Sequence, residues 1–309
     1  MRTALTAITD ELKRLKATGV KSVSVSEEGM SVLRRVVAAR LKETAGHNSE
    51  REISSPPATR LPVSAPVPAM PRSVVAKTEL PAEPKLPAPP VVVLPEGDKA
   101  ARWNWLGNLV LNHPVCTENI RPGKKVVLGV GSLDAKIMFV GEAPGAEEEI
   151  QGEPFVGPAG QLLTKMIGGM GLKRADVYIG NIMNWRPQTP TPAGAEQIGN
   201  RAPTAEEMTF CLPFLRAQIE IVNPEVIVAL GSTAAQGLLG AGSFKALGEI
   251  RGRWKQFAEK PVMVTYHPSY ILRNGSNRSK RMVWEDLLKV MERLAMPVSD
   301  KQRGYFLDK

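Results

Sequence analysis

Four short apolar runs, rich in β-branched residues, recur through the second half of the chain, and segments with helical periodicity separate them. The runs are "KIMFVG" (136–141), "VYIGNIM" (177–183), "EVIVALG" (225–231) and "PVMVTYH" (261–267). They hardly alternate between apolar and polar residues, which is typical of strands buried on both faces of a parallel sheet. The segments between them have helical spacing: "GQLLTKMIGGMGL", "TAEEMTFCLPFLRAQIEIV" and "STAAQGLLG". This order predicts an α/β fold, a three-layer α/β/α sandwich around a mainly parallel four-stranded sheet.

The rest of the chain has a different character. Residues 1–45 contain apolar residues at helical spacing and predict an N-terminal segment of two helices. Residues 46–98 are rich in Pro, Ala, Val and Ser, a composition that forms neither helices nor a sheet ladder, so we expect a disordered linker there. The sandwich is then expected over residues 99–297, and residues 298–309 form a C-terminal tail.

Composition restricts the class of protein. The 309 residues include 43% hydrophobic residues and carry a formal net charge of +9, which favours polyanionic partners. No apolar run reaches the roughly 18 residues that a membrane-spanning helix needs, and the N-terminus lacks the pattern of a signal peptide. We therefore expect a cytoplasmic protein without a membrane partner. The two cysteines, Cys116 and Cys211, are too few for a disulfide framework.

Four unusual loops follow the four predicted strands. In a parallel sheet the loops at the carboxyl ends of the strands gather at one edge, where ligands bind. Neither a phosphate-binding P-loop nor a GxGxxG dinucleotide motif is present among them. We expect one shared site, formed by "GEAPG" (141–145), "NIMNWRP" (181–187), "GSTAA" (231–235) and "HPS" (267–269).

Each of these features also has a simpler interpretation. "GEAPG" alone is equally well a turn, because Gly and Pro follow many strands. The acidic run Glu147, Glu148 and Glu149 alone is more typical of a solvated face, Phe155 of a core residue, and His267 of a structural histidine. Their placement around a single sheet edge favours a functional site.

Taken together and in this order, the motifs resemble the uracil-DNA glycosylase superfamily, most closely its family 4 of bacteria and archaea. The resemblance covers roughly residues 110–295, and it implies a DNA-repair hydrolase. Such an enzyme flips uracil out of the base stack, hydrolyses its N-glycosidic bond and leaves an abasic site. The segments that carry it are "GEAPGAEEEIQGEPFVGPAGQLL", "NIMNWRPQTPTP", "TAEEMTFCLPFLRAQIEIVNPEVIVALG" and "HPS".

The resemblance implies three catalytic residues. His267 would lie beside the uracil O2 and donate a hydrogen bond as negative charge develops there. Glu142 and Glu148 would position water or stabilise the cationic sugar, and the division of labour between them stays open. The family pattern "GEAPGxxED" places Glu148 at its Glu, whereas Glu149 replaces its Asp.

The same motifs imply a set of substrate-binding residues. Phe155 would stack on the flipped base. The Asn181 amide would donate to the uracil O4 and accept from its N3–H, a pattern that cytosine presents in reverse. Gly141, Ala143 and Ser269 belong to the same motifs and complete the set.

The segment "HPSYILRNGSNRSKR" suits contact with DNA. In related enzymes this loop enters the duplex, so Leu272 is the candidate wedge that fills the vacated stack. The cations that follow would hold phosphates and make binding sensitive to salt: Arg273, Arg278, Lys280 and Arg281. A solvated basic loop that leads to the last helix is the alternative.

The cysteines depart from the family pattern. Family 4 enzymes generally hold a [4Fe–4S] cluster on four cysteines, and only Cys116 and Cys211 match such positions. Trp185 stands where a third would be. Two thiolates cannot supply the usual four-cysteine ligation, so these two are candidate remnants of a cluster site. We expect no cluster, no other metal and no diffusible cofactor.

Two functions remain open. The first is a uracil-DNA glycosylase whose partner is uracil-containing DNA, with hypoxanthine or xanthine as further candidate bases. The second is a weakly active or inactive DNA-binding module, recruited by a protein partner of residues 1–45. In both cases we expect a monomer at the nucleoid. An insertion, "TPAGAEQIGNRAP" (191–203), predicts a loop that alters the DNA-facing surface.

Overall fold

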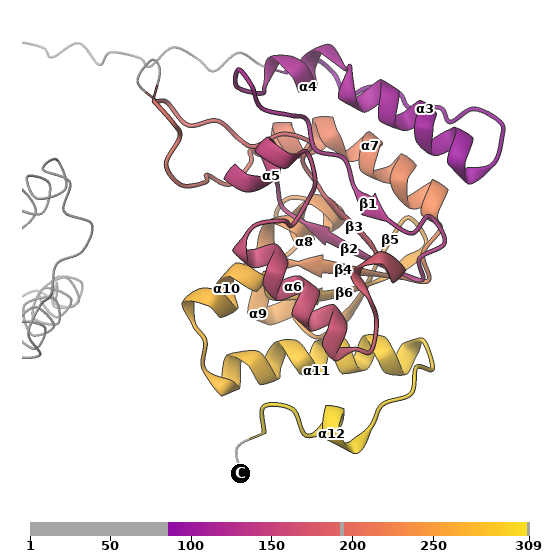
Figure 1. The fold of residues 1–309 in the computed structure, drawn as a ribbon, viewed down its shortest axis with the longest axis vertical. Helices are drawn as coiled ribbons and strands as arrows, with labels where there is room; N and C mark the ends of the chain where they lie inside the picture. The colour runs from indigo at the N-terminus through magenta and orange to yellow at the C-terminus, as the bar shows by residue number, and fades with distance from the viewer. Residues whose placement is uncertain (1–85, 192–194, 308–309) are drawn as a thin grey trace, which may run out of the picture. The chain divides into compact units, whose positions relative to one another are not determined.

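The computed structural model describes residues 86–191 and 195–307, so the helices predicted in residues 1–45 and most of the predicted linker lie outside the described residues. The described part is built on one six-stranded sheet with the order β1-β3-β2-β4-β6-β5 (Figure 1). The strands are β1 Val130–Gly131, β2 Ile137–Gly141, β3 Tyr178–Asn181, β4 Val226–Leu230, β5 Trp254–Phe257 and β6 Lys260–Thr265.

The four predicted strands are present as β2, β3, β4 and β6, and they are parallel to one another. The sheet is nevertheless wider than the four strands we expected, because β1 and β5 add an antiparallel strand at each edge. Both edge strands were hard to predict. β1 is two residues long, and β5, "WKQF", is largely exposed and polar.

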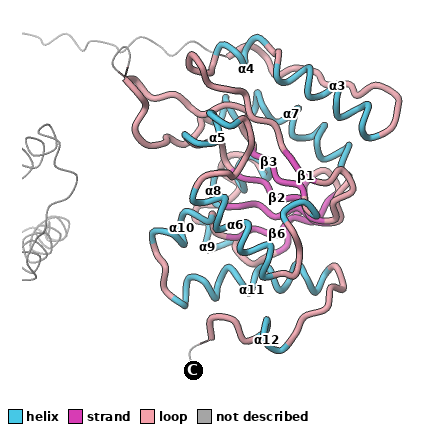
Figure 2. The backbone as a smooth tube through the Cα atoms, viewed as in Figure 1, coloured by secondary structure: helices cyan, strands magenta, loops and turns pink. Residues whose placement is uncertain are grey.

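Helices cover both faces of the sheet, which confirms the predicted three-layer sandwich (Figure 2). Residues of α3, α7 and α8 pack on one face, and residues of α6, α10 and α11 pack on the other. The helices are α3 Lys99–Leu111, α4 Pro114–Glu118, α5 Ala146–Gln151, α6 Pro158–Gly169, the 3-10 turn η2 Arg174–Asp176, α7 Ala205–Val222, α8 Gly231–Leu239, α9 Leu247–Ile250, α10 Pro268–Arg273, α11 Asn277–Arg293 and α12 Asp300–Arg303. None of these helices is long and apolar enough to cross a membrane.

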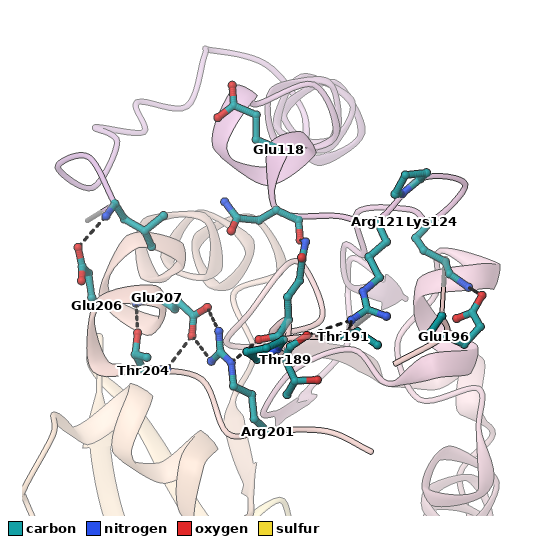
Figure 3. Close-up of a pocket in the computed structure, with 16 residues that line it drawn as sticks. Glu118, Arg121, Lys124, Thr189, Thr191, Glu196, Arg201, Thr204, Glu206 and Glu207 are labelled. Atoms are coloured by element: carbon teal, nitrogen blue, oxygen red, sulfur yellow. Dashed lines mark hydrogen bonds and ion pairs between the residues drawn. The ribbon is translucent and has the colours of Figure 1, made fainter. Parts of the chain in front are cut away.

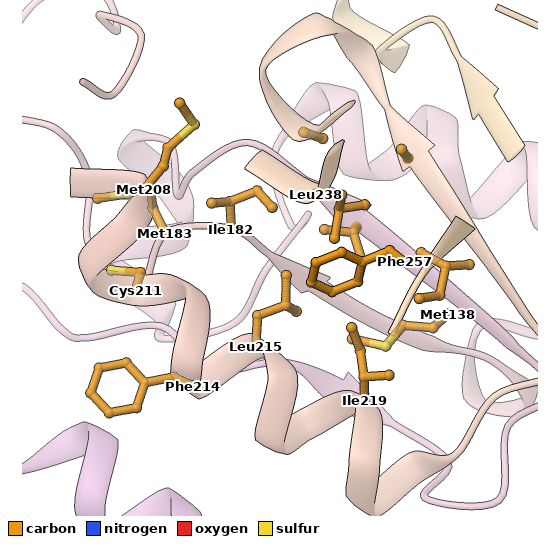
Figure 4. Packing of buried hydrophobic residues seen from close by; sticks show 14 of the residues in the cluster. Met138, Ile182, Met183, Met208, Cys211, Phe214, Leu215, Ile219, Leu238 and Phe257 are labelled. Atoms are coloured by element: carbon orange, nitrogen blue, oxygen red, sulfur yellow. The ribbon is translucent and has the colours of Figure 1, made fainter. Parts of the chain in front are cut away.

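The central strands are apolar throughout because successive side chains enter opposite layers. In β2, Met138 and Val140 belong to the core under α7 and α8, whereas Ile137 and Phe139 belong to the core under α6 and α11. All four are buried. Figure 4 shows the first of these cores, with Met138 close to side chains of α7 and α8.

Both domain boundaries differ from those we expected. Residues 86–98 do not all belong to a free linker, because Leu86, Val92 and Leu94 pack against the core. The backbone N–H of Leu86 also donates to Oε1 of Glu206 at 2.7 Å. The folded part therefore includes residues before 99.

The C-terminal segment is likewise part of the domain. The indole N–H of Trp284 donates to the carbonyl of Gln302 at 2.6 Å, and the Gln302 amide donates to the carbonyl of Gly169 at 2.9 Å. Tyr305 lies on the same indole with a centroid distance of 5.1 Å. Residues 298–306 thus close over α6 and α11 and do not form the separate tail that we expected.

Aromatic side chains fill the core around the two cysteines. Trp185, Cys116 and Cys211 are completely buried. The Trp185 ring lies 6.0 Å from that of Phe210, centroid to centroid, and the His113 ring lies 5.5 Å from Phe210. Shape complementarity between these rings holds α4 and α7 to the loop after β3.

We expect Trp185→Ala to lower the free energy of unfolding by about 3–5 kcal/mol, because it leaves a cavity the size of an indole in this core. Trp185→Phe should cost less, since the indole N–H has no hydrogen-bond partner among the described residues. Urea denaturation measures both. Trp105→Ala at a partly exposed position is the control, and equal costs for the two alanine variants would contradict this view of the core.

Candidate active site

A cavity of about 570 Å³ opens at the carboxyl ends of β2, β3, β4 and β6. All four loops that were expected to share a site contribute to its wall. The residues that line it are Glu142, Ala143, Gly145, Glu148, Phe155, Ala159, Asn181, Asn200, Gly231, Ser232, Thr233, Leu247, Tyr266, His267, Ser269, Tyr270 and Arg273.

Gly141 lies behind this cavity and allows its two main side chains to meet. It pairs with Asn181 across β2 and β3. A Cβ at position 141 would lie 2.4 Å from Cζ of Phe155 and 2.5 Å from Oδ1 of Asn181, closer than any real side chain could approach. Gly141 does not itself line the cavity but leaves space for Phe155 and Asn181, and the substrate-binding role that we expected for it stays a prediction.

Phe155 has an unusual backbone conformation. Its φ of 55° lies in the left-handed region, which costs a non-glycine residue of order 1–3 kcal/mol and is common at functional sites. Helix α6 also approaches closely, since a Cβ on Gly160 would lie 1.8 Å from the carbonyl oxygen of Phe155. The ring is buried, and its position is determined by this tight loop.

Glu148 stabilises the Phe155 loop. Its carboxylate accepts hydrogen bonds from the backbone N–H groups of Gly145 at 3.1 Å and of Val156 and Gly157, both at 3.0 Å. Both carboxylate oxygens are thus used by the backbone. These contacts give Glu148 a positioning role for the Phe155 loop, and because it also lines the cavity, its expected catalytic role stays a prediction.

Asn181 has an unpaired acceptor in the cavity wall. The residue is 6% exposed, and its Oδ1 has no hydrogen-bond partner among the described residues. A buried amide oxygen without a partner costs free energy, of order 1–3 kcal/mol, unless a ligand satisfies it. Because Asn181 lines the cavity, an N–H donor of a bound ligand is a candidate partner for this oxygen.

His267 caps α10 in a defined tautomer. The backbone N–H of Ser269 donates to its Nδ1 at 3.2 Å, and the Ser269 hydroxyl lies 2.8 Å from the same atom. Because Nδ1 accepts, the neutral ring carries its proton on Nε2 and can donate from there. Burial, aided by the charge of Arg273, lowers the pKa of His267 to about 4, so the ring is neutral near pH 7.

Glu142 provides a carboxyl group in the same cavity. Burial raises its pKa above the ordinary value, and a hydrogen bond from the Thr233 side chain partly opposes that rise. Thr233 lies in the first turn of α8, directly after β4. Unlike Glu148, Glu142 has a carboxylate with no backbone hydrogen bond among those identified, which leaves it available to water or substrate.

The expected DNA-binding residues lie in different surroundings. Leu272 is 52% exposed, and Arg273 lines the cavity. Arg278 and Lys280 lie in the first turn of α11, Arg278 exposed and Lys280 half-buried.

Arg281, which we expected to hold a phosphate, is engaged within the protein, and its contact with DNA stays a prediction. Its guanidinium pairs with Glu285 at 2.9 Å and donates to the carbonyls of Arg303 at 2.7 Å and Tyr305 at 2.9 Å. It therefore holds the C-terminal segment.

Sequence reasoning missed Asn200, which the insertion brings to the cavity. Its Oδ1 accepts from Nε of Arg186 at 2.8 Å. Arg186 is buried and forms an ion pair with buried Glu149 at 2.8 Å. No local sequence motif predicts this arrangement, because an ion pair between α5 and a distant loop produces no periodic pattern in the sequence.

The residues at the expected cluster positions do not fit a four-cysteine cluster. Burial raises the pKa of Cys116 to about 12 and that of Cys211 well above its ordinary value, so both thiols keep their protons. Trp185 occupies the third position with an apolar ring. Across residues 86–191 and 195–307, no three His, Cys, Asp or Glu side chains are grouped to hold a metal ion.

A larger cavity of about 790 Å³ lies elsewhere, between α4, the loop after β3 and the start of α7 (Figure 3). Its charged side chains are largely engaged with one another. Arg201 pairs with Glu207 at 2.7 Å, and Lys124 pairs with Glu196 at 3.3 Å. This cavity contains none of the expected catalytic groups, so the smaller one is the candidate site.

Comparison with known proteins agrees with this geometry. The model of the uracil DNA glycosylase superfamily matches residues 128–288. A Type-4 uracil-DNA glycosylase of Thermotoga maritima is 47% identical over 167 residues, 53% of this chain and 80% of that protein. One from Archaeoglobus fulgidus is 42% identical over 154 residues, 47% of this chain and 71% of that protein.

A more distant relative is a Type-5 uracil-DNA glycosylase of Pyrobaculum aerophilum, 33% identical over 174 residues, which are 53% of this chain and 73% of that protein. The matched part of the chain contains every strand of the sheet and the loops of the cavity. The chain belongs to the uracil-DNA glycosylase superfamily.

Proposed function

We propose that the protein hydrolyses the N-glycosidic bond of uracil in DNA and leaves an abasic site. The observation that carries this proposal is the cavity itself, which joins a buried ring, an unpaired amide oxygen, a neutral histidine and a half-buried carboxyl group: Phe155, Asn181, His267 and Glu142. The Type-4 names of the similar proteins support the same reaction.

Base recognition follows from two of these residues. A flipped uracil stacks on the Phe155 ring, which the strained loop holds in place. The unpaired Oδ1 of Asn181 accepts from the uracil N3–H, and the amide nitrogen donates to O4. Cytosine has an acceptor at N3 and a donor at position 4, so it opposes both of these hydrogen bonds.

Bond cleavage uses the other two residues. As the glycosidic bond breaks, negative charge develops on uracil, and the Nε2–H of neutral His267 donates to O2. The carboxylate of Glu142 stabilises the developing positive charge on the sugar and accepts a proton from the attacking water. Burial of Glu142 strengthens both electrostatic effects.

The intact set of groups supports an enzyme over the inactive DNA-binding module. DNA is the proposed partner, and contact with it would place the protein at the nucleoid in the cytoplasm. The protein partner of residues 1–45 and the monomeric state stay proposals of the same kind.

The direct test uses oligonucleotides that contain one uracil, single-stranded and in a duplex, followed by alkaline cleavage of abasic sites. The protein should give product on uracil-containing DNA, and His267→Ala should slow it about 10²–10³-fold, the typical loss for an oxyanion-type donor. That variant also controls for contaminating host enzyme. Equal product from both proteins would refute the proposal.

We further propose that catalysis proceeds without an iron–sulfur cluster, because two protonated thiols and Trp185 stand at the cluster positions. Protein purified without oxygen should contain neither iron nor acid-labile sulfide in proportion to the chain. A chelator should leave its excision rate and unfolding midpoint unchanged. Four irons per chain would overturn this proposal.

Asn181→Asp tests base reading. A carboxylate cannot donate to O4, so excision of uracil should fall about 10- to 100-fold, in line with a lost buried hydrogen bond of about 1–3 kcal/mol. Discrimination against cytosine should weaken in parallel, because the carboxylate can accept from the cytosine amino group. Competition between uracil- and cytosine-containing strands measures the ratio. An unchanged preference for uracil would refute the role of Asn181.

Thr233→Val tests Glu142 through the pH profile. The raised pKa of Glu142 means that its active carboxylate form is lost at a higher pH than for an ordinary Glu as the solution is acidified. Removing the Thr233 hydroxyl, which lowers that pKa, should move the acid limb of kcat/KM to still higher pH. Thr233→Ser should keep the wild-type profile. His267, with a pKa of about 4, does not titrate in the neutral range, so identical profiles for all three proteins would exclude Glu142 as the titrating group.

A further inference from the structure

Ile198, in the middle of the insertion, is almost fully exposed. Its side chain is 95% accessible, more than any other exposed large apolar residue of the described part. The residue before it, Gln197, is by contrast 6% exposed. An isoleucine side chain exposed to this extent gains little from folding and is available for contact with a partner.

The turn that carries Ile198 is fixed by buried polar groups. The NH2 group of Arg186 donates to the carbonyl of Gly199 at 2.8 Å and to that of Gln197 at 3.4 Å, on either side of Ile198. The Gln197 side chain accepts from Arg121 at 2.7 Å and donates to the carbonyl of Pro187 at 3.1 Å. Arg186 is in turn held by its ion pair with Glu149. The exposed side chain therefore stands on a rigid support.

This turn is adjacent in sequence to a residue of the cavity wall. Asn200 lines the cavity, and Ile198 is only two residues away, so their Cα atoms are within about 7 Å. Nucleotides of one strand follow each other every 3.4 Å along a duplex. A neighbour of the flipped nucleotide is thus within reach of Ile198.

Ile198 and Leu272 belong to loops that follow two well-separated strands of the sheet. Ile198 follows β3, and Leu272 follows β6, with β2 and β4 between these strands. Three strand spacings of about 4.8 Å place the carboxyl ends of β3 and β6 roughly 14 Å apart. Leu272 is 52% exposed, and its neighbour Arg273 lines the cavity.

We propose that Ile198 is, besides Leu272, a second apolar DNA contact, which packs against the base next to the flipped uridine. Apolar side chains that enter a base step compensate for the stacking lost when a nucleotide is displaced. This inference rests on the proposed function, since it takes the cavity as the place of the flipped base.

The test compares Ile198→Ala with Val91→Ala, a matched exposed β-branched residue (90% accessible) that does not line the cavity. Because Ile198 makes no use of its side chain in the fold, the variant should keep the wild-type unfolding midpoint. We expect kcat/KM on a duplex with one uracil to fall about tenfold in Ile198→Ala and to stay within twofold in Val91→Ala. Ile198→Leu should retain most of the activity.

A binding measurement separates this inference from the proposed function. Affinity for a duplex with a non-hydrolysable 2′-fluoro-deoxyuridine, followed by anisotropy, should fall about tenfold in Ile198→Ala, and 2-aminopurine beside the uridine should report weaker unstacking. Wild-type affinity in this variant would overturn the inference, even if uracil is excised. If wild-type protein excises no uracil, the proposed function fails, and the affinity ratio still decides whether Ile198 contacts DNA.

Discussion

The close packing around Gly141 is the constraint on which the site depends. Two side chains from different segments, Phe155 and Asn181, occupy the volume that a Cβ at this position would need. The ring and the amide can meet at one point of the cavity wall only because β2 carries no side chain there. Gly141 and Asn181 are also paired positions of β2 and β3, so this steric requirement lies within the sheet that carries the site.

Three acidic residues, Glu142, Glu148 and Glu149, have different roles because the fold places them in different surroundings. Glu148 binds backbone N–H groups and holds the Phe155 loop, and Glu149 is buried in an ion pair with Arg186. Glu142 retains a half-buried carboxyl group that lines the cavity. The environment of an acidic residue is hard to predict from the sequence, because its burial and its hydrogen-bond partners depend on distant segments of the chain.

The order of elements was predictable from the sequence because parallel strands buried on both faces leave continuous apolar runs, and β2, β3, β4 and β6 fall in those runs. The motif loops were predictable because they follow those strands. Asn200, Arg281 and the two edge strands were not, since their positions depend on long-range contacts. From the sequence alone, Arg281 is expected to be a solvent-exposed cation. In the structure its guanidinium donates hydrogen bonds to carbonyls of the C-terminal segment.

Aromatic side chains fill the core near Cys211, at the place where Type-4 enzymes normally hold an iron–sulfur cluster. Trp185, Phe210 and His113 fill the space with rings in contact, and the thiols remain protonated. Hydrophobic burial can stabilise this region without the covalent links of a metal site. The loop after β3 is then held by Trp185 on one side and by the Glu149–Arg186 pair on the other.

A crystal structure of the protein with free uracil tests the proposed base pocket most directly. We expect uracil stacked on Phe155 in the 570 Å³ cavity, with its N3–H on Asn181 and its O2 within hydrogen-bonding distance of Nε2 of His267. Uracil bound instead in the larger cavity beside Arg121, or cytosine bound equally well in the smaller one, would contradict it.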